Sequence, residues 1–136
     1  MEIRRYVASD FDGVEALWEE AFPNDPPRNR ADVAIPAKLA VQPELFFVAL
    51  DGGAVIGSVM AGYDGHRGWL YSVAVQQTCK RGGVGTALVR EAERALHALG
   101  CEKINLQVRA ANEAVVQFYR ALGYAVEDRI SLGRRL

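Results

Sequence analysis

Three glycines and two cations gather at residues 80–85, where the sequence is KRGGVG, and together they could bind an anion. An apolar segment with helical spacing follows them. Glycine leaves the main chain open to a ligand, and the first N–H groups of a helix have no internal partner and carry the positive end of the helix dipole. The stretch therefore predicts a site for a phosphate or pyrophosphate, with the charges of Lys80 and Arg81 beside it.

The residues after the glycines disfavour two other nucleotide-binding loops. A nucleotide-hydrolysing P-loop closes with Gly-Lys-Ser/Thr, because the lysine neutralises the outer phosphates and the hydroxyl holds magnesium. Here Gly85 is followed by Thr86 and Ala87. A dinucleotide loop needs a small residue three places after its second glycine, where this chain has Leu88. A tight turn that binds nothing remains the simpler alternative.

The loop resembles the pyrophosphate loop of the GNAT N-acetyltransferases, whose motif is Arg/Gln-x-x-Gly-x-Gly/Ala, with Lys80 in place of the first Arg or Gln. A second part of the chain, NEAVVQFYRALGY at 112–124, resembles another signature of that family. The turn GYDGHRG at 62–68, with Leu17-Trp18 and NDP at 24–26, is similar to a small bacterial branch. The resemblance covers nearly the whole chain.

The resemblance implies acetyl-CoA as co-substrate, without a metal, and direct transfer of its acetyl group to a primary amine. Main-chain groups of Val73 and Val75 would pair with the pantetheine arm, and the Val75 N–H would polarise the thioester carbonyl. Asn112 would cap a helix and touch the same arm. The cofactor-binding residues expected from the resemblance are Val73, Ala74, Val75, Lys80, Arg81, Gly82, Gly83, Val84, Gly85, Thr86 and Asn112.

Tyr119 is the general acid that the resemblance implies. In the family, the tyrosine of this signature lies near the sulfur of coenzyme A and protonates the thiolate as it leaves. A phenol with an ordinary pKa of about 10 holds its proton at neutral pH. Tyr119 also continues an apolar stripe with Val115 and Leu122, so a core tyrosine is the alternative.

The general base is left open by the sequence. Many family members have a carboxylate on the strand before the loop, near the position that Tyr71 holds here. Asp64 and His66 in the preceding turn, or a water ordered by Tyr71, are the candidates, although turn formation also explains the first two. An amine of low pKa would need no base. The alternative function is an acyl-CoA-binding or regulatory protein with reduced catalysis.

The acceptor site is expected between the first two helices, as in the family. Asp25 could attract a cationic amine and Arg28 a carboxylate, although an ion pair between the two is the simpler explanation. Trp18 and Phe22 continue an apolar helical stripe and are expected in the core. The partner is thus a small-molecule or peptide amine whose identity the sequence does not specify.

The elements that would position these residues follow from apolar spacing and turn residues. Helices are expected at 14–22, 31–41, 84–99 and 115–122, and strands at 2–7, 45–50, 54–61, 69–75, 104–108, 124–126 and 130–132. A strand–helix–strand unit places the glycine loop at the carboxyl edge of the sheet. The expected class is α/β (α+β), with a mixed, mostly antiparallel sheet of six to seven strands and about four helices on its two faces.

The composition predicts one globular domain over residues 1–136. Hydrophobic residues make up 50% and charged residues 24% of the chain. The net charge of −1 gives no reason to expect nucleic acid as a partner. No apolar run spans a bilayer and the N-terminus has no apolar signal core, so a cytoplasmic protein without a membrane partner is expected. The family implies a monomer or homodimer.

Overall fold

A computed structural model describes residues 1–136. Two compact units divide the chain, residues 1–106 and residues 107–136, and each is described by itself. The single domain that the composition predicts stays a prediction. None of the helices combines the length and the apolar character that a membrane crossing requires.

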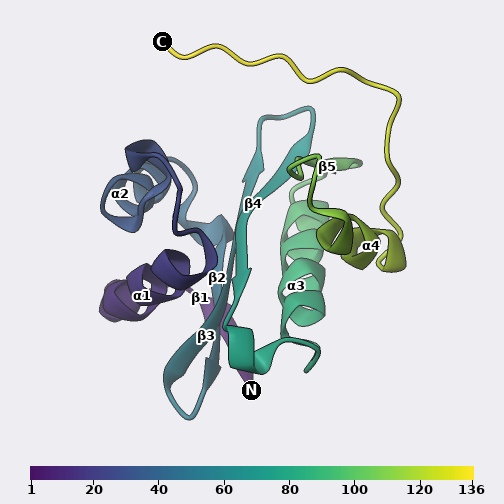
Figure 1. The fold of residues 1–136 in the computed structure, drawn as a ribbon. Helices are drawn as coiled ribbons and strands as arrows, with labels where there is room; N and C mark the ends of the chain where they lie inside the picture. Colours follow the sequence, from purple (N-terminus) through teal and green to yellow (C-terminus); the bar gives the residue numbers. More distant parts are fainter. The chain divides into compact units, whose positions relative to one another are not determined.

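A five-stranded sheet in the order β1-β2-β3-β4-β5 forms the framework of the first unit (Figure 1). Its strands are β1 (Glu2–Arg5), β2 (Phe46–Asp51), β3 (Ala54–Tyr63), β4 (Gly68–Val75) and β5 (Ile104–Leu106). The first four are antiparallel to their neighbours, and β5 runs parallel to β4. A parallel pair needs a crossover, and the helix between β4 and β5 supplies it.

Three helices cover the two faces of this sheet (Figure 1). They are α1 (Phe11–Ala21) and α2 (Ala31–Val41) on one face, and α3 (Val84–Ala98) on the other. The interior strand β2, between β1 and β3, is buried from Phe46 to Leu50, as expected for a strand covered on both faces. Pro36 lies inside α2, and the buried Ile35 beside it holds this helix on the sheet.

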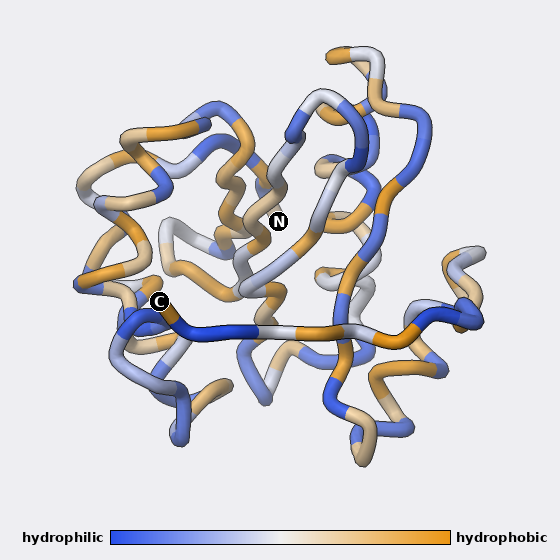
Figure 2. Tube along the Cα trace, turned by 90° about the horizontal axis from the view of Figure 1, so that it is seen from above, coloured by the Kyte–Doolittle hydropathy of each residue, from blue (hydrophilic) through white to orange (hydrophobic).

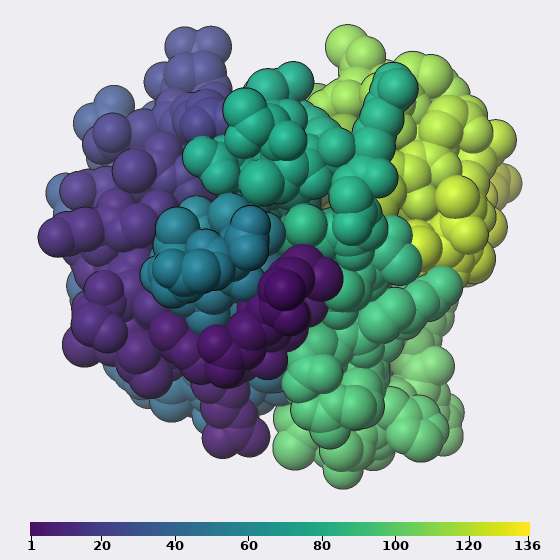
Figure 3. Space-filling view, turned by 90° about the horizontal axis from the view of Figure 1, so that it is seen from below, coloured from purple at the N-terminus to yellow at the C-terminus, as the bar shows by residue number.

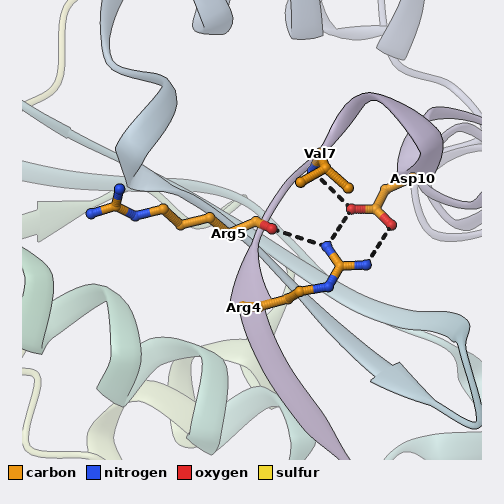
Figure 4. Close-up of polar contacts among 4 residues, drawn as sticks. All are labelled: Arg4, Arg5, Val7 and Asp10. Atoms are coloured by element: carbon orange, nitrogen blue, oxygen red, sulfur yellow. Dashed lines mark hydrogen bonds and ion pairs between the residues drawn. The ribbon is translucent and has the colours of Figure 1, made fainter.

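The start of α1 is tied to β1 by a buried carboxylate (Figure 4). Asp10 is 5% exposed and binds both terminal nitrogens of Arg4, at 2.7 and 3.0 Å, and the Val7 N–H at 2.9 Å. The hydrogen bond from Arg4 is the main reason why the pKa of Asp10 is lowered. This bidentate pair fixes the direction in which the chain enters α1.

The second unit contains α4 (Glu113–Ala121). Gly123, with φ 101°, follows the last turn in the left-handed conformation that favours glycine. Beyond it, hydrophobic and hydrophilic residues follow one another in short runs of unequal length up to the C-terminus (Figure 2).

The hairpin predicted at 124–126 and 130–132 is wrong, because no strand forms after Leu106. Val126, Ile130 and Leu132 are 68%, 89% and 92% exposed. Each apolar run is only three residues long, and charged residues separate the two, so the pair has no apolar face to bury. An isolated two-stranded hairpin is marginal in water. The sheet therefore has five strands, not six or seven.

Candidate functional site

An open strand edge is the first feature of the site. β4 pairs with β5 only through Gly68, Trp69 and Leu70, opposite Ile104, Asn105 and Leu106. β4 then continues to Val75 without a strand on that side. A strand edge presents main-chain N–H and C=O groups that an extended ligand can pair with. The side chain of Ala74 is buried in the core, whereas Val73 and Val75 are half-buried.

A β-bulge begins where this edge opens. Ser58 and Met60 on β3 face Ala74 and Tyr71 on β4, so β4 has one extra residue between them. Ser72 has φ 51°, which is unusual for a residue with a side chain. Bulges bend a strand and redirect the residues that follow, so this one sets the direction of the open edge.

Two buried side chains hold the bulge in place. Ser58 Oγ donates a hydrogen bond to the Ser72 carbonyl at 2.9 Å and accepts one from Trp18 Nε1 at 2.8 Å. Ser58 is fully buried and Trp18 is 4% exposed. Buried polar groups are costly unless paired, so the chain Trp18–Ser58–Ser72 links α1 to the bulge on β4. Trp18 is thus a core residue, as the sequence predicts.

The glycine loop follows β4 after a short helical turn at Gln77–Cys79. Residues 80–83 are exposed, and the green-teal atoms of the loop lie at the surface in Figure 3. Arg81 has φ 70°, and Gly83 precedes α3 with φ 82°, a conformation that costs a non-glycine residue about 1–2 kcal/mol. Between them, the main chain at Gly82 lies close to the Cys79 carbonyl oxygen, and a Cβ on residue 82 would lie 3.3 Å from that oxygen.

The first turn of α3 offers main-chain N–H groups and no side-chain cap. Its first internal hydrogen bond runs from the Ala87 N–H to the Gly83 carbonyl, so the N–H groups of Val84, Gly85 and Thr86 precede the helical ladder. The Val84 side chain is buried, because Gly57 on β3 has no Cβ to keep it from the sheet. Such a turn binds anions through its main chain.

In the second unit, Asn112 caps α4 as predicted, because its Oδ1 accepts the Val115 N–H at 3.3 Å. Tyr119 is 7% exposed, and its ring meets those of Phe118 and Tyr124 edge-on, with centroids 5.0 and 5.5 Å apart. Burial raises the pKa of Tyr119 to about 12. A phenol with that pKa is a proton donor at neutral pH, which suits an acid and equally suits a core residue.

The two base candidates in the turn before β4 shape the backbone. Asp64 Oδ1 accepts the N–H groups of His66 and Arg67 at 2.8 and 2.7 Å. These hydrogen bonds to the main chain, Arg67 first, lower the pKa of Asp64. Both Asp64 and His66 are exposed. The geometry favours the turn explanation for Asp64.

Lys38 is a residue of interest that the sequence analysis missed. It lies on α2, is 5% exposed, and donates to the Ala61 carbonyl and, at 2.9 Å, to the Tyr71 hydroxyl. Burial lowers the pKa of Lys38 to about 8. One signal was available, because Lys38 is the single charged residue between 33 and 43. Its partner lies 33 positions away and could not be inferred.

A groove of about 380 Å³ lies beside α1 and the start of α2. It is lined by Glu15, Trp18, Glu19, Phe22, Pro23, Asp25, Asn29, Arg30, Ala31 and Asp32. Four of these side chains are carboxylates and one is a cation. Of the residues considered for the acceptor site, Trp18, Phe22 and Asp25 line the groove, whereas Arg28 does not.

The model of the acetyltransferase (GNAT) family matches residues 11–124. The chain belongs to the GNAT family. An acetyltransferase of Yersinia enterocolitica is 45% identical over 136 residues, which cover 100% of this chain and 96% of the relative. The resemblance inferred from the loop is confirmed, and the protein is an acetyl-CoA-dependent acetyltransferase.

Solved GNAT structures share the fold. A putative acetyltransferase of Agrobacterium tumefaciens has a TM-score of 0.79 at 21% identity and covers 100% of both chains. The aminoglycoside N-acetyltransferase AAC(6')-Iy, solved in complex with CoA, has a TM-score of 0.80 at 19% identity, covering 98% of this chain and 93% of its own. The predicted mixed α/β class is confirmed, apart from the strand count.

Proposed function

We propose that this GNAT protein transfers the acetyl group of acetyl-CoA to a primary amine by direct attack. The observation that carries the proposal is the position of the open β4 edge, which leads straight into the main-chain anion site at the start of α3. Coenzyme A has matching parts in the same order, because its extended pantetheine arm leads to a pyrophosphate. The pyrophosphate would bind the N–H groups of residues 83–86, and Lys80 and Arg81 would add charge.

The pantetheine arm would pair with the main chain of Val73 and Val75 along the open edge. Pairing of this kind is indifferent to side chain, so the buried Ala74 can lie between them. The N–H of Val75 would donate to the thioester oxygen and stabilise the negative charge that develops there. Asn112, the cap of α4, would contact the same arm.

In the reaction, the neutral amine nitrogen forms a bond to the thioester carbon, and the carbon–sulfur bond breaks. Tyr119 gives its proton to the departing thiolate, the nitrogen that becomes positively charged on attack gives one proton to water, and the Tyr119 phenolate takes a proton back from water. No metal takes part in this proposal. Lys80 replaces the usual arginine of the loop, which keeps the charge and loses the planar fork.

The acceptor would be a cationic small-molecule or peptide amine. The groove beside α1 supports this, because carboxylates outnumber cations in its lining. Among the structural neighbours is AAC(6')-Iy in complex with a bisubstrate analogue of CoA and acetylneamine. We further propose that the protein is a cytoplasmic monomer or homodimer without a membrane partner. The net charge of −1 gives no reason to propose a nucleic-acid partner.

The test is release of free thiol from acetyl-CoA with a panel of amino acids, polyamines, aminoglycosides and peptide N-termini. We expect at least one amine to be acetylated, and Tyr119→Phe to lower kcat about 10²-fold or more with that amine, as for other general acids. Tyr124→Phe, on the neighbouring ring, is the matched control. No thiol release with any amine would favour an acyl-CoA-binding or regulatory protein, the alternative motivated by Tyr71 in place of a strand carboxylate.

A further inference from the structure

Lys38 is a buried amine without an acidic partner. Its Nζ contacts are the Ala61 carbonyl on β3 and the Tyr71 hydroxyl on β4, and it also lies 5.3 Å from the centre of the Tyr71 ring. No carboxylate forms an ion pair with it. Glu44 in the short helical turn Pro43–Leu45 is the charged group whose field reaches Lys38. A buried ammonium without a counter-ion favours its neutral form.

The neutral form of Lys38 suits the contacts that the side chain makes. An uncharged amine has two N–H donors and one lone pair. It can donate to the Ala61 carbonyl and accept the hydrogen of the Tyr71 hydroxyl. Since burial lowers the pKa of Lys38 to about 8, a fraction of the protein carries this neutral amine near neutral pH. In the same way, burial leaves catalytic lysines partly in the neutral form that can accept a proton at neutral pH.

Tyr71 connects this amine to the open edge of β4. It is the first residue after the last β4–β5 pair at Leu70, and it directly precedes the bulge at Ser72. Val73, which would pair with the pantetheine arm, lies two residues farther along the strand, beyond the bulge. Tyr71 is 42% exposed, so a ligand can reach its ring from solvent. Lys38, in contrast, is reached through the Tyr71 hydroxyl.

We propose that Tyr71 and Lys38 form a two-residue proton relay that deprotonates the acceptor amine. The Tyr71 oxygen takes a proton from the substrate ammonium and passes its own proton to the lone pair of Lys38 Nζ. One substrate N–H bond breaks, one Lys38 N–H bond forms, and the phenol is regenerated. Lys38 later returns the proton to water through Tyr71. The relay rests on the proposed function, and it would do the work of the strand carboxylate that this chain lacks.

The first test measures kcat against pH for an alkylamine that the wild type acetylates. We expect kcat to rise with pH through an inflection near 8 and to keep that inflection when the alkylamine is exchanged for one of different pKa. Lys38→Met and Tyr71→Phe should both lose the inflection and at least tenfold in kcat. Both should still acetylate hydroxylamine or another amine that is neutral at pH 7, because it needs no base.

Two further variants separate proton transfer from structure. Lys38→Arg keeps a charged donor that does not deprotonate, so it should behave as Lys38→Met does. Recovery of kcat in Lys38→Arg would mean that Lys38 only holds Tyr71 in place, which overturns the relay. His66→Ala should keep the wild-type dependence of kcat on pH. If the inflection disappears in His66→Ala, the base is His66 and not the relay. Stabilisation by acetyl-CoA, measured by thermal unfolding, confirms that each variant is folded.

A second readout does not depend on turnover. The chain has three lysines, Lys38, Lys80 and Lys103, so a ¹³C-lysine NMR titration can be assigned with Lys38→Met. We expect the Lys38 signal to titrate near 8, and Tyr71→Phe to move it. Titration of Lys38 above 10 would overturn the relay even in an active enzyme. If the wild type acetylates no amine, the proposed function fails and the relay with it. If it does so while Lys38→Met keeps the wild-type profile, only the relay fails.

Discussion

The glycine loop and the Lys38–Tyr71 pair are built in opposite ways. The loop at residues 80–83 is exposed, and its binding groups are main-chain N–H groups that any sequence would carry. The pair is made of side chains from α2 and β4, one of them buried. The loop therefore depends on the conformation that glycine permits, and the pair depends on the chemical identity of two residues. Changes at each region should separate cofactor binding from proton transfer.

The largest effect is expected at Gly83. A side chain there is strained at φ 82°, so Gly83→Val should displace the N–H groups of the loop. Loss of two hydrogen bonds to a charged pyrophosphate, each about 1.5 kcal/mol, weakens acetyl-CoA binding about 100-fold. Calorimetric titration with acetyl-CoA measures this.

Gly65→Val is the matched control. Gly65 has φ 91° in the turn before β4 and, like Gly83, has open space where a Cβ would lie. Both variants should lose about 1–2 kcal/mol of unfolding free energy, while only Gly83→Val loses affinity. Equal loss of affinity in the two variants would mean that general destabilisation explains the result, and that the loop is only a turn.

The next effect is on the pH dependence of the unfolding free energy, which should change with Lys38 and not with the lysine of the glycine loop. The pKa of Lys38 is lowered from 10.5 to about 8 in the folded state, so the unfolded chain binds more protons between these pH values. Wild-type stability should therefore rise from pH 8 to about 10.5. Lys38→Met should lack this rise and be more stable at pH 7 by about 1–2 kcal/mol, because it buries no charge.

Urea denaturation at pH 7 and pH 9.5 measures that difference. Lys80→Met is the control, since Lys80 is exposed in the loop. We expect no change in the pH slope for that variant. A Lys38→Met protein that is less stable than the wild type at pH 7, with an unchanged pH slope, would show that the Lys38 ammonium stabilises the fold.

The smallest effect on activity is expected at the bulge of β4, which lies in the chain between Tyr71 and the glycine loop. Ser58→Ala leaves Trp18 Nε1 and the Ser72 carbonyl without their buried partner, which costs about 1–3 kcal/mol of unfolding free energy. The KM for acetyl-CoA should rise severalfold as the bulge relaxes. Ser72→Ala keeps the main-chain carbonyl and should change neither quantity to this extent. Equal effects in both variants would mean that the Trp18–Ser58 contact does not hold the bulge.

Most of the fold follows from the sequence because its signals are local. Apolar residues at helical spacing predicted α3 to within a residue at each end, and Asp51-Gly52-Gly53 lies at the turn between β2 and β3. The terminal hairpin was mispredicted because an apolar segment of three residues does not show whether its side chains are buried. Val126 and Ile130 are apolar and exposed.

The candidate site likewise has parts that local sequence signals predict and parts that depend on tertiary contacts. Glycine and cation spacing predicted the loop, because glycine in the sequence reports directly on the main chain. The bulge at Ser72 could not be predicted, because its cause is a hydrogen bond from Ser58 and Trp18, distant in the chain. Lys38 and Tyr71 meet only through the packing of α2 on the sheet. Pairings made by tertiary contact leave no local signal.

Thermal unfolding with acetyl-CoA, with ATP and NAD at equal concentration as controls, tests the central claim most directly. A ligand at about 100 times its dissociation constant adds roughly 2.7 kcal/mol to the folded state, enough to raise the midpoint of this domain by several degrees. We predict that rise with acetyl-CoA alone. The loop lacks the Gly-Lys-Ser/Thr sequence of an ATP-binding P-loop, and Leu88 stands where a dinucleotide loop needs a small residue. No rise with acetyl-CoA, or an equal rise with ATP or NAD, would contradict the account.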